Sequence, residues 1–491
     1  MNCKELNKAR EYEIISEERI PNEERAYFHL TPRTGWMNDP NGFSYYGGKY
    51  HLFYQYYPYD TSWGPMHWGH ACTEDFIKWE HLPAALAPDQ DYDANGCWSG
   101  SGISLKDGRH ALIYTGMLEN KQTGEVKQTQ CLAIGDGIDY TKFDNNPVID
   151  ETMLPKGASK EDFRDPKVWY DEEEQQYYLV VGNRTEDGSG AVLLFQSEDM
   201  KNWKYTTTLD RSNNEYGKMW ECPDFFSLGD THVLLVSPQE MRAKGREFHN
   251  GNNSMCILGN YDNSTHKFIR KSIQSVDQGL DFYAPQTLEA TDGRRIMIGW
   301  MQSWESCRNQ PHGNHFFGTM SVPRELSIEN DKLLQWPVRE LENYRANHVN
   351  YNDVIFKDEM QLDGIKGRVL DMVIDLDMPL ATAEDVVSIK LARDEENETL
   401  IQYNPQSGLL RFDRSNCGFN CDIVNVREVD TTPHNLKLRI LLDRYSVEIF
   451  VNQGERVLTS TFYTPDLATE IVFAATSETR MTIDKWDIVG C

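Results

Sequence analysis

Three acidic residues lie in short motifs whose neighbours could support chemistry. They are Asp39 in "GWMNDPNG", Asp165 in "FRDPK" and Glu221 in "WECPD". Asn, Asp, Pro and Gly are common in turns, so Asp39 taken alone is equally a candidate turn residue. The three acids could also bind a structural cation or cap hairpins. Whether they act chemically depends on whether the fold brings them together.

Carboxylates that meet in a buried site raise one another's pKa, so that one can stay protonated while its neighbour ionises. A proton donor and a nucleophile can then coexist, as glycoside hydrolysis requires. Aromatic side chains that suit stacking on sugar rings are available for a rim, namely Trp36, Trp63, Trp98, Tyr283 and Trp300. Such rims also line the pockets of sugar-binding proteins that have no activity.

Length and composition indicate a globular protein of two or three domains. The chain has 491 residues, with 39% hydrophobic residues, 24 Tyr, 20 Phe and 12 Trp. Its formal charge of −28 would repel a phosphate backbone or an anionic membrane surface, so neither nucleic acid nor a membrane is an expected partner. No stretch reaches the 18 or so apolar residues of a membrane span. The charged start of the chain lacks the pattern of a signal peptide, which favours a cytoplasmic location.

The cysteines and histidines give no sign of a metal site. The ten cysteines are scattered without CxxC pairs, and the 13 histidines show no HExxH spacing. We therefore expect free thiols, no metal and no cofactor.

Five strand-like runs recur through the first two thirds of the chain. Their centres are Phe53, Ile113, Leu179, Leu235 and Ile298, and the intervals between them are all about 60 residues, which suits a multi-stranded unit. Each run follows a visible hairpin turn, such as "YYGGK" or "ATDGR". The pairs Asp75–Trp79 and Asp199–Trp203 have the same spacing, and they look like parts of the outer strands of two units. The first domain is therefore predicted to be a five-bladed β-propeller.

The repeats place the acids in register. Fourteen residues before the five centres stand Asp39, Ser99, Asp165, Glu221 and Ala284, so three acids occupy the same phase of three repeats. Equivalent positions at the start of each inner strand gather around the axis of a propeller. We therefore expect the three carboxylates to meet at one end of that axis.

The motifs "WMNDPNG", "FRDPK" and "WECPD", in this order, resemble the three signature motifs of glycoside hydrolase family 32, the β-fructofuranosidases. The segments "FYQYYP", "GCWSGS", "FYAPQTL", "IGWMQSW" and "VPRELSI" resemble the same family, and the likeness covers nearly the whole chain.

The resemblance implies roles for individual residues. Asp39 would be the nucleophile, Glu221 the general acid and base, and Asp165 the stabiliser of the transition state. Arg164 would help to hold the fructose hydroxyls. The residues that match the family's fructose subsite are Asn38, Gln55, Trp63, Trp98, Ser99 and Trp300. The implied reaction is a retaining double displacement through a fructosyl-enzyme, without a cofactor.

The domain boundaries follow from changes in composition. We expect a charged helical leader at 1–25, the propeller at 26–338, a linker at 339–349 and a β-sandwich at 350–491, the last as the resemblance implies. In "SVEIFVNQGERV" apolar residues alternate across a hairpin turned at Asn452–Gly454. Packing against the propeller is the expected role of the sandwich.

The expected partner is a small saccharide, with terminal β-D-fructose released from sucrose or short fructo-oligosaccharides. Sucrose-6-phosphate is a second possible substrate, and the leader resembles that of intracellular sucrose-6-phosphate hydrolases. A phosphate would need a basic rim, for which Arg246 and Arg308 are candidates. The sequence is also compatible with a fructosyltransferase and with a sugar-binding protein without turnover. It does not predict the oligomeric state.

Overall fold

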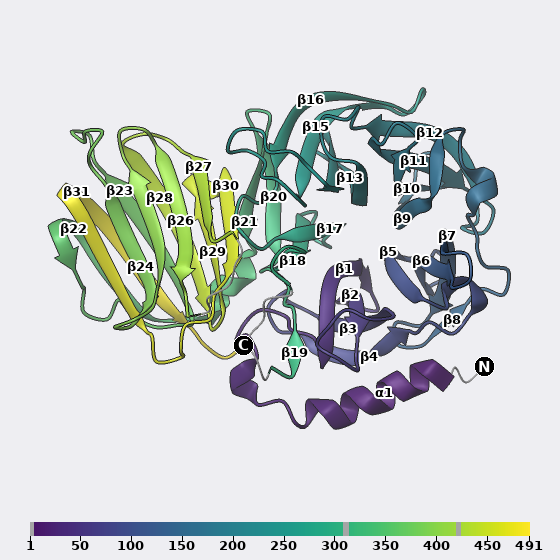
Figure 1. Ribbon diagram of the computed structural model, residues 1–491, viewed down its shortest axis with the longest axis horizontal. Coiled ribbons are helices and arrows are strands. Elements are labelled where there is room, and N and C mark those ends of the chain that lie inside the picture. Colours follow the sequence, from purple (N-terminus) through teal and green to yellow (C-terminus); the bar gives the residue numbers. More distant parts are fainter. Residues whose placement is uncertain (1–3, 308–313, 419–423) are drawn as a thin grey trace.

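The computed structural model describes residues 4–307, 314–418 and 424–491. The chain forms a ring of five β-sheets followed by a larger β-domain, and Figure 1 shows the two parts side by side. The inner strands β1, β5, β9, β13 and β17 surround one centre in that view. The prediction of a five-bladed β-propeller followed by a β-sandwich is confirmed.

Each blade is an antiparallel sheet built from four strands in chain order. The first blade contains β1 (Gly35–Tyr46), β2 (Lys49–Tyr57), β3 (His67–Thr73) and β4 (Glu80–Leu86). The second contains β5 (Gly96–Ser104), β6 (His110–Asn120), β7 (Glu125–Gly135) and β8 (Tyr140–Lys142). The third contains β9 (Ala158–Asp171), β10 (Gln176–Thr185), β11 (Gly190–Ser197) and β12 (Lys204–Arg211).

The fourth blade contains β13 (Met219–Leu228), β14 (Thr231–Gln239), β15 (Met255–Asp262) and β16 (Lys267–Ser275). The fifth contains β17 (Tyr283–Glu289), β18 (Arg295–Trp300), β20 (Arg324–Glu329) and β21 (Lys332–Pro337). A two-residue strand, β19 (Phe316–Phe317), runs parallel to the start of β1 and joins the sheet of the first blade. Short 3₁₀ turns lie at η1 (Asn22–Glu24), η2 (Asp91–Asp93) and η3 (Glu151–Met153).

The second strand of each blade carries the hydrophobic centre that the sequence predicts. Phe53, Ile113, Leu179, Leu235 and Ile298 lie in β2, β6, β10, β14 and β18, and all five are fully buried. They are apolar because both faces of a blade pack against neighbouring blades. Truncation of one of them, such as Leu179→Ala, should cost about 2–5 kcal/mol of stability.

The Asp–Trp pairs of the first and third blades lie in turns and not in outer strands, which corrects the prediction. Asp75 and Asp199 precede β4 and β12, and each accepts two backbone N–H bonds from the turn. The residues that follow them, Phe76 and Met200, adopt positive φ values of 65° and 63°. The shared spacing reflects one turn type that leads into the outer strand.

All five inner strands contain an irregularity at the same height. In β1 the pairing with β2 shifts between Met37 and Pro40, and the same shift occurs between residues 98 and 100, 164 and 167, 221 and 224, and 283 and 286. Such β-bulges bend a strand and redirect its side chains. Prolines that cannot donate to a ladder occupy these stretches, at Pro40, Pro166, Pro223 and Pro285.

The N-terminal helix α1 (Lys4–Glu17) packs along β4 at the edge of the propeller, as Figure 1 shows. Arg10 Nε donates to Ala84 O at 2.9 Å, and Glu13 accepts the Ala84 N–H at 3.0 Å. Burial raises the pKa of Glu13 to about 7. The helix is thus attached by polar bonds to an edge strand that would otherwise leave these backbone groups unpaired.

The second domain is one continuous ten-stranded sheet folded over its own core. It follows the 3₁₀ turn η4 (Arg339–Tyr344) and starts with β22 (Arg345–Met360). The other strands are β23 (Leu370–Asp377), β24 (Val387–Arg393), β25 (Glu398–Asn404), β26 (Leu409–Asn416), β27 (Val426–Asp430), β28 (Asn435–Asp443), β29 (Ser446–Val451), β30 (Arg456–Thr461) and β31 (Glu470–Ile488).

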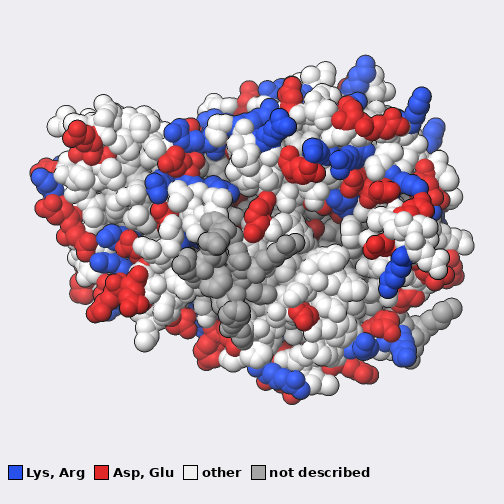
Figure 2. All heavy atoms as spheres, in the orientation of Figure 1, with Lys and Arg blue, Asp and Glu red and all other residues white. Residues whose placement is uncertain are grey.

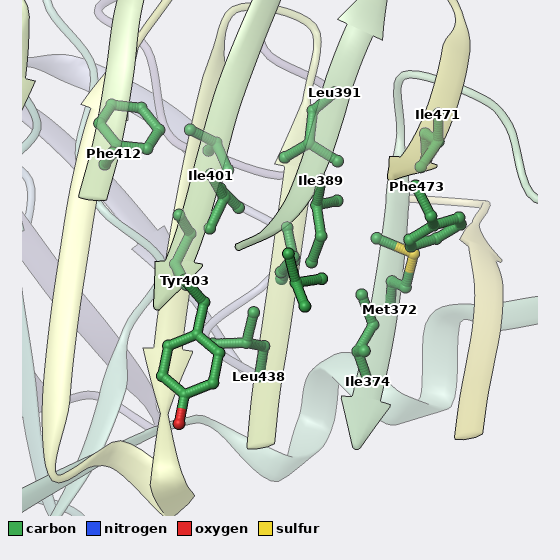
Figure 3. Packing of buried hydrophobic residues seen from close by; sticks show 14 of the residues in the cluster. Met372, Ile374, Ile389, Leu391, Ile401, Tyr403, Phe412, Leu438, Ile471 and Phe473 are labelled. Carbon is green, nitrogen blue, oxygen red and sulfur yellow. The ribbon is translucent and has the colours of Figure 1, made fainter. Parts of the chain in front are cut away.

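The long strand β31 connects the two layers of this domain. Its first half pairs with β24 and its second half with β23, so one strand takes part in both layers. Figure 3 shows the core between them, where Ile389, Ile401 and Phe412 face Met372 and Leu438. The hairpin β29–β30 turns at η5 (Asn452–Gly454), where the sequence predicts it.

Candidate active site

The inner-strand bulges bring the three predicted acids to one place. The Sγ atom of Cys222 lies 3.7 Å from Asp39 Oδ2 and 3.5 Å from Asp165 Oδ2. The Cys222 N–H also donates to Asp165 Oδ2 at 2.9 Å, and Glu221 is the preceding residue. Residues from three blades therefore meet at one end of the propeller axis.

The bulges also correct the predicted phase of the acids. Glu221 is the last paired residue before its bulge, whereas Asp165 is the first residue within its own bulge and Asp39 the second. By this register the equivalent of Glu221 in the third blade is Arg164, and the equivalent of Asp165 in the fourth is Cys222. The repeat brings the three acids to the same height in the propeller. Their different positions relative to the bulges point their side chains in different directions.

Asp39 is held by short polar contacts on both oxygens. Ser99 Oγ donates to Oδ2 at 2.7 Å, and Asn38 Nδ2 donates to Oδ1 at 3.1 Å. The Asn38 oxygen in turn accepts the Trp36 indole N–H at 2.7 Å. Asp39 is 8% exposed. A carboxylate with both oxygens fixed in this way is oriented for attack on a bound carbon.

Glu221 accepts a hydrogen bond on each oxygen. Arg164 Nε donates to Oε1 at 2.9 Å, and the Tyr283 hydroxyl donates to Oε2 at 2.6 Å. Arg164 is buried and also bonds Asp162 at 3.0 Å and Gln128 at 3.3 Å. Glu221 is thus positioned from the third and fifth blades at once.

Burial sets the protonation of the site. It raises the pKa of Asp165 to about 7, with the neighbouring Glu221 carboxylate adding to the effect and Arg164 opposing it. Burial and Glu221 also raise the pKa of Asp39. Burial and the surrounding carboxylates raise the pKa of the Cys222 thiol well above its usual range, which keeps it neutral. Asp165 therefore retains a proton close to neutral pH.

The predicted aromatic residues divide into a buried wall and an exposed rim. Trp36, Tyr283 and Trp300 are at most 3% exposed, whereas Trp63 is 48% exposed. Trp63 meets Trp98 edge to face, with ring centroids 6.2 Å apart. Trp63 and Trp98 therefore remain for contact with a ligand at the entrance, and the other three shape the wall.

Gln55 and the polar bonds beyond the bulges link neighbouring inner strands next to the site. Gln55, which lies opposite the bulge of β1, donates to Cys97 O at 3.1 Å. Gln286 of β17 accepts the Phe43 N–H at 2.8 Å and donates to Gly100 O at 3.0 Å, while Asn41 accepts the Gly100 N–H at 3.1 Å. These bonds join β1, β5 and β17 and form a polar floor.

Sequence reasoning missed four residues of this site. They are Cys222 between the acids, Gln128 behind Arg164, and Trp304 and Phe317, which stack on Trp36 with ring centroids 6.2 and 4.7 Å away. Cys222 could have been found, because its Cys-Pro pair matches the Asp-Pro pairs of the first and third blades. Gln128 and Phe317 carry no such signal.

Within the described residues no group of three His, Cys, Asp or Glu side chains could hold a metal ion. No helix in the same residues is long and apolar enough to cross a membrane.

The two arginines proposed for a phosphate rim can be placed only in part. Arg246 bonds Asp430 at 2.9 Å and Glu428 at 3.5 Å, and Arg308 lies outside the described residues. Figure 2 shows acidic and basic side chains intermixed on the face in view.

Comparison with known proteins places the geometry in a family. Residues 29–337 match the model of the N-terminal domain of glycosyl hydrolases family 32, and residues 340–488 match that of its C-terminal domain. A sucrose-6-phosphate hydrolase of Zymomonas mobilis is 38% identical over 440 residues, covering 87% of this chain and 84% of its own. A raffinose invertase of Escherichia coli is 37% identical over 454 residues, covering 89% of each chain.

Solved structures agree with this result. A GH32 β-fructofuranosidase of Bombyx mori superposes with a TM-score of 0.85 at 32% identity over 99% of both chains, and a mutant of it has been solved with sucrose. The sucrose-6-phosphate hydrolase of Lactobacillus gasseri gives a TM-score of 0.85 at 26% identity, over 98% of this chain and 96% of its own. Because the two family models together match residues 29–337 and 340–488, which include the propeller and the sandwich, the chain belongs to glycosyl hydrolase family 32.

Proposed function

We propose that this chain is a retaining β-fructofuranosidase that releases terminal fructose from sucrose and short fructo-oligosaccharides. The observation that carries the proposal is the meeting of Asp39, Asp165 and Glu221 around the Cys222 thiol, with separate partners holding each acid. Two oriented carboxyl groups and a retained proton are what a double displacement at a glycosidic carbon needs.

In the proposed mechanism, Asp39 attacks the anomeric C2 of the terminal fructosyl unit. Glu221 gives its proton to the departing oxygen, and the covalent fructosyl-enzyme forms. Water then attacks C2 while Glu221 takes a proton from it, the bond between C2 and the Asp39 carboxylate breaks, and fructose leaves. Asp165 forms no bond to carbon, and it stabilises the ring through its hydroxyls as positive charge develops.

Substitution of the two reacting acids tests this assignment. Asp39→Ala and Glu221→Ala should each lower kcat on sucrose by far more than the roughly 10²–10⁴-fold of general acid–base catalysis alone, with the fold intact by circular dichroism. Asp107→Asn, on an exposed hairpin, is the matched control and should keep full activity. A Glu221→Ala enzyme with more than a tenth of the parent rate would refute the assignment.

Sucrose-6-phosphate is the second candidate substrate, because several relatives carry the name sucrose-6-phosphate hydrolase. Arg246, one of the two candidates for a phosphate rim, already pairs with Asp430 and Glu428, so it gives no support to a phosphate site. We expect kcat/KM on sucrose to equal or exceed that on sucrose-6-phosphate. A preference above about tenfold, near 1.4 kcal/mol, for the phosphorylated sugar would reverse this order.

We also propose that the protein works in the cytoplasm. Cys72, Cys97, Cys131, Cys222 and Cys256 in the propeller, and Cys417 and Cys491 beyond it, are free thiols. Free cysteines are typical of reducing compartments. Cys3 and Cys421 lie outside the described residues. Titration under denaturing, non-reducing conditions should find most of the ten thiols reactive.

A further inference from the structure

The segment that enters the inner strand of the fifth blade is hydrogen-bonded to the edge of the β-sandwich. Gln278 N donates to Val457 O at 2.8 Å, and the N–H groups of Leu280 and Asp281 donate to Thr459 O at 2.9 and 3.0 Å. A Cβ atom on Gly279 would lie 2.1 Å from Thr459 N, so glycine is needed for this approach. Strand β30 of the sandwich therefore fixes the path of the chain just before β17.

The side chain of Asp281 is fully buried and joins three parts of the molecule. Its Oδ2 atom accepts the Thr461 N–H at 2.8 Å and also binds the guanidinium of Arg414 from β26. Its Oδ1 atom accepts the Ser306 hydroxyl at 2.9 Å. Arg414 donates in addition to Thr461 O at 2.9 Å and is itself 4% exposed.

Both ends of this connection lead to the catalytic pocket. Two residues after Asp281, the Tyr283 hydroxyl donates to Glu221 Oε2 at 2.6 Å. Ser306 belongs to the turn that carries Trp304, whose ring lies 5.2 Å from Trp300. Asp281 thus holds the strand that supports Glu221 and also the turn that completes the aromatic wall.

A buried ion pair is a costly way to obtain stability, because apolar side chains of the same volume often serve as well. Directional bonds to Thr461, Ser306 and the guanidinium fix the position of Asp281, which apolar packing would not do. The ion pair between Asp281 and Arg414 therefore serves to fix the position of Asp281.

We propose that Arg414 of the β-sandwich is a positioning residue for the acid and base Glu221, acting through Asp281 and Tyr283. The sandwich then contributes to the chemistry of the propeller although none of its described residues contacts the three acids. This proposal depends on the role of Glu221 proposed above.

A double-mutant cycle with Tyr283 tests the proposal. Arg414→Met should lower kcat on sucrose about tenfold and change KM by less than about threefold, because the fructose subsite is kept while Glu221 loses its alignment. In a Tyr283→Phe background the same change should cost less than about twofold, since the bond through which it acts is already absent. An equal loss in both backgrounds, or no loss in either, would overturn the proposal.

A matched control separates positioning from stability. Arg439 and Asp371 form a buried ion pair at 2.8 Å within the sandwich, without a link to Tyr283. Arg439→Met should lower the unfolding temperature as Arg414→Met does, with kcat unchanged. A comparable loss of kcat in Arg439→Met would show a general effect of stability and refute positioning.

Milder variants keep the test decisive if Arg414→Met does not fold. Asp281→Asn retains the volume and an acceptor but loses the charge, and Ser306→Ala removes only the bond to Oδ1. Each should lower kcat by about threefold or more with KM nearly constant, whereas unchanged kcat in both variants would contradict the proposal. Failure of the Glu221 assignment would be recognised separately, by an active Glu221→Ala enzyme.

Discussion

At the scale of single residues, the site depends on like charges held close together in a buried space. Burial and the neighbouring Glu221 carboxylate raise the pKa of Asp165 to about 7, so Asp165 keeps its proton until the pH passes neutrality. Arg164 limits the effect, because its guanidinium favours ionised carboxylates. The site therefore holds a proton on Asp165 in mildly acidic and neutral solution.

This protonation predicts the pH dependence. The value of kcat/KM on sucrose should fall as the pH rises above about 7, because Asp165 then loses its proton and adds a negative charge beside Asp39 and Glu221. Asp165→Asn removes the group whose pKa is about 7, so the alkaline limb should no longer lie near that pH. Rates measured from about pH 5 to pH 9 check this, with Asp107→Asn as the control. An unmoved limb in Asp165→Asn would contradict the assignment of this limb to Asp165.

At the scale of elements, the same bulge in five inner strands creates the site. The bulges turn the side chains of Asp39, Asp165 and Cys222 toward one another, and prolines prevent the strands from pairing regularly there. A second group of elements holds the two domains together, where the segment before β1 meets β28 and β29. His29 lies between Asp443 at 2.8 Å and Glu448 at 2.9 Å in this interface.

The His29 contacts predict how stability depends on pH. Bonds to the two carboxylates raise the pKa of His29 to about 9 although burial opposes them. The folded pKa exceeds the unfolded value of about 6.5, so the stabilisation is complete below about pH 6.5 and is lost as the pH rises through about 9. His29→Gln should cost about 3 kcal/mol near pH 6 and less near pH 10.

Thermal unfolding at about pH 6, 8 and 10 measures this difference. His348→Gln is the control, because His348 is about half exposed and its bond to Asp484 at 2.7 Å is a surface contact. We expect the control to change stability by less than about 0.5 kcal/mol at each pH. If the difference in stability between the parent and His29→Gln grows as the pH rises, the predicted pH dependence is wrong.

At the scale of the whole molecule, the ring of blades decides which part of a substrate can enter. The bonds among Asn41, Gly100 and Gln286 join three inner strands beyond the acids, and we expect them to close the site at its inner end. A closed pocket admits a chain end and excludes a chain interior. We therefore expect attack from the terminal fructose only.

Product analysis on a long fructan tests this expectation. At early times inulin should yield free fructose and no internal oligosaccharides, and short fructo-oligosaccharides should react faster than long chains. Chromatography of the first few per cent of conversion separates the two outcomes. Early release of internal oligosaccharides would refute the closed pocket.

The architecture and the choice of the three acids could be predicted from the amino-acid sequence alone. The spacing of about 60 residues between apolar centres, and the turns before them, are local patterns that a propeller repeats, so they could be read without coordinates. Asp39, Asp165 and Glu221 stood out because each lies in a short motif next to Pro, Asn, Arg or Trp. The fold class and the family followed from these patterns.

The directions in which the acids point, and the groups that support them, could not be predicted in this way. Glu221 lies just before its bulge, Asp165 is the first residue within its bulge and Asp39 the second, which a count along the chain does not resolve. Gln128, Phe317 and Arg414 reach the site or its supports from distant parts of the sequence, and their own neighbours in the chain give no sign of it. Periodicity is a property of neighbouring residues, whereas contacts among blades and between domains depend on the complete packing of the molecule.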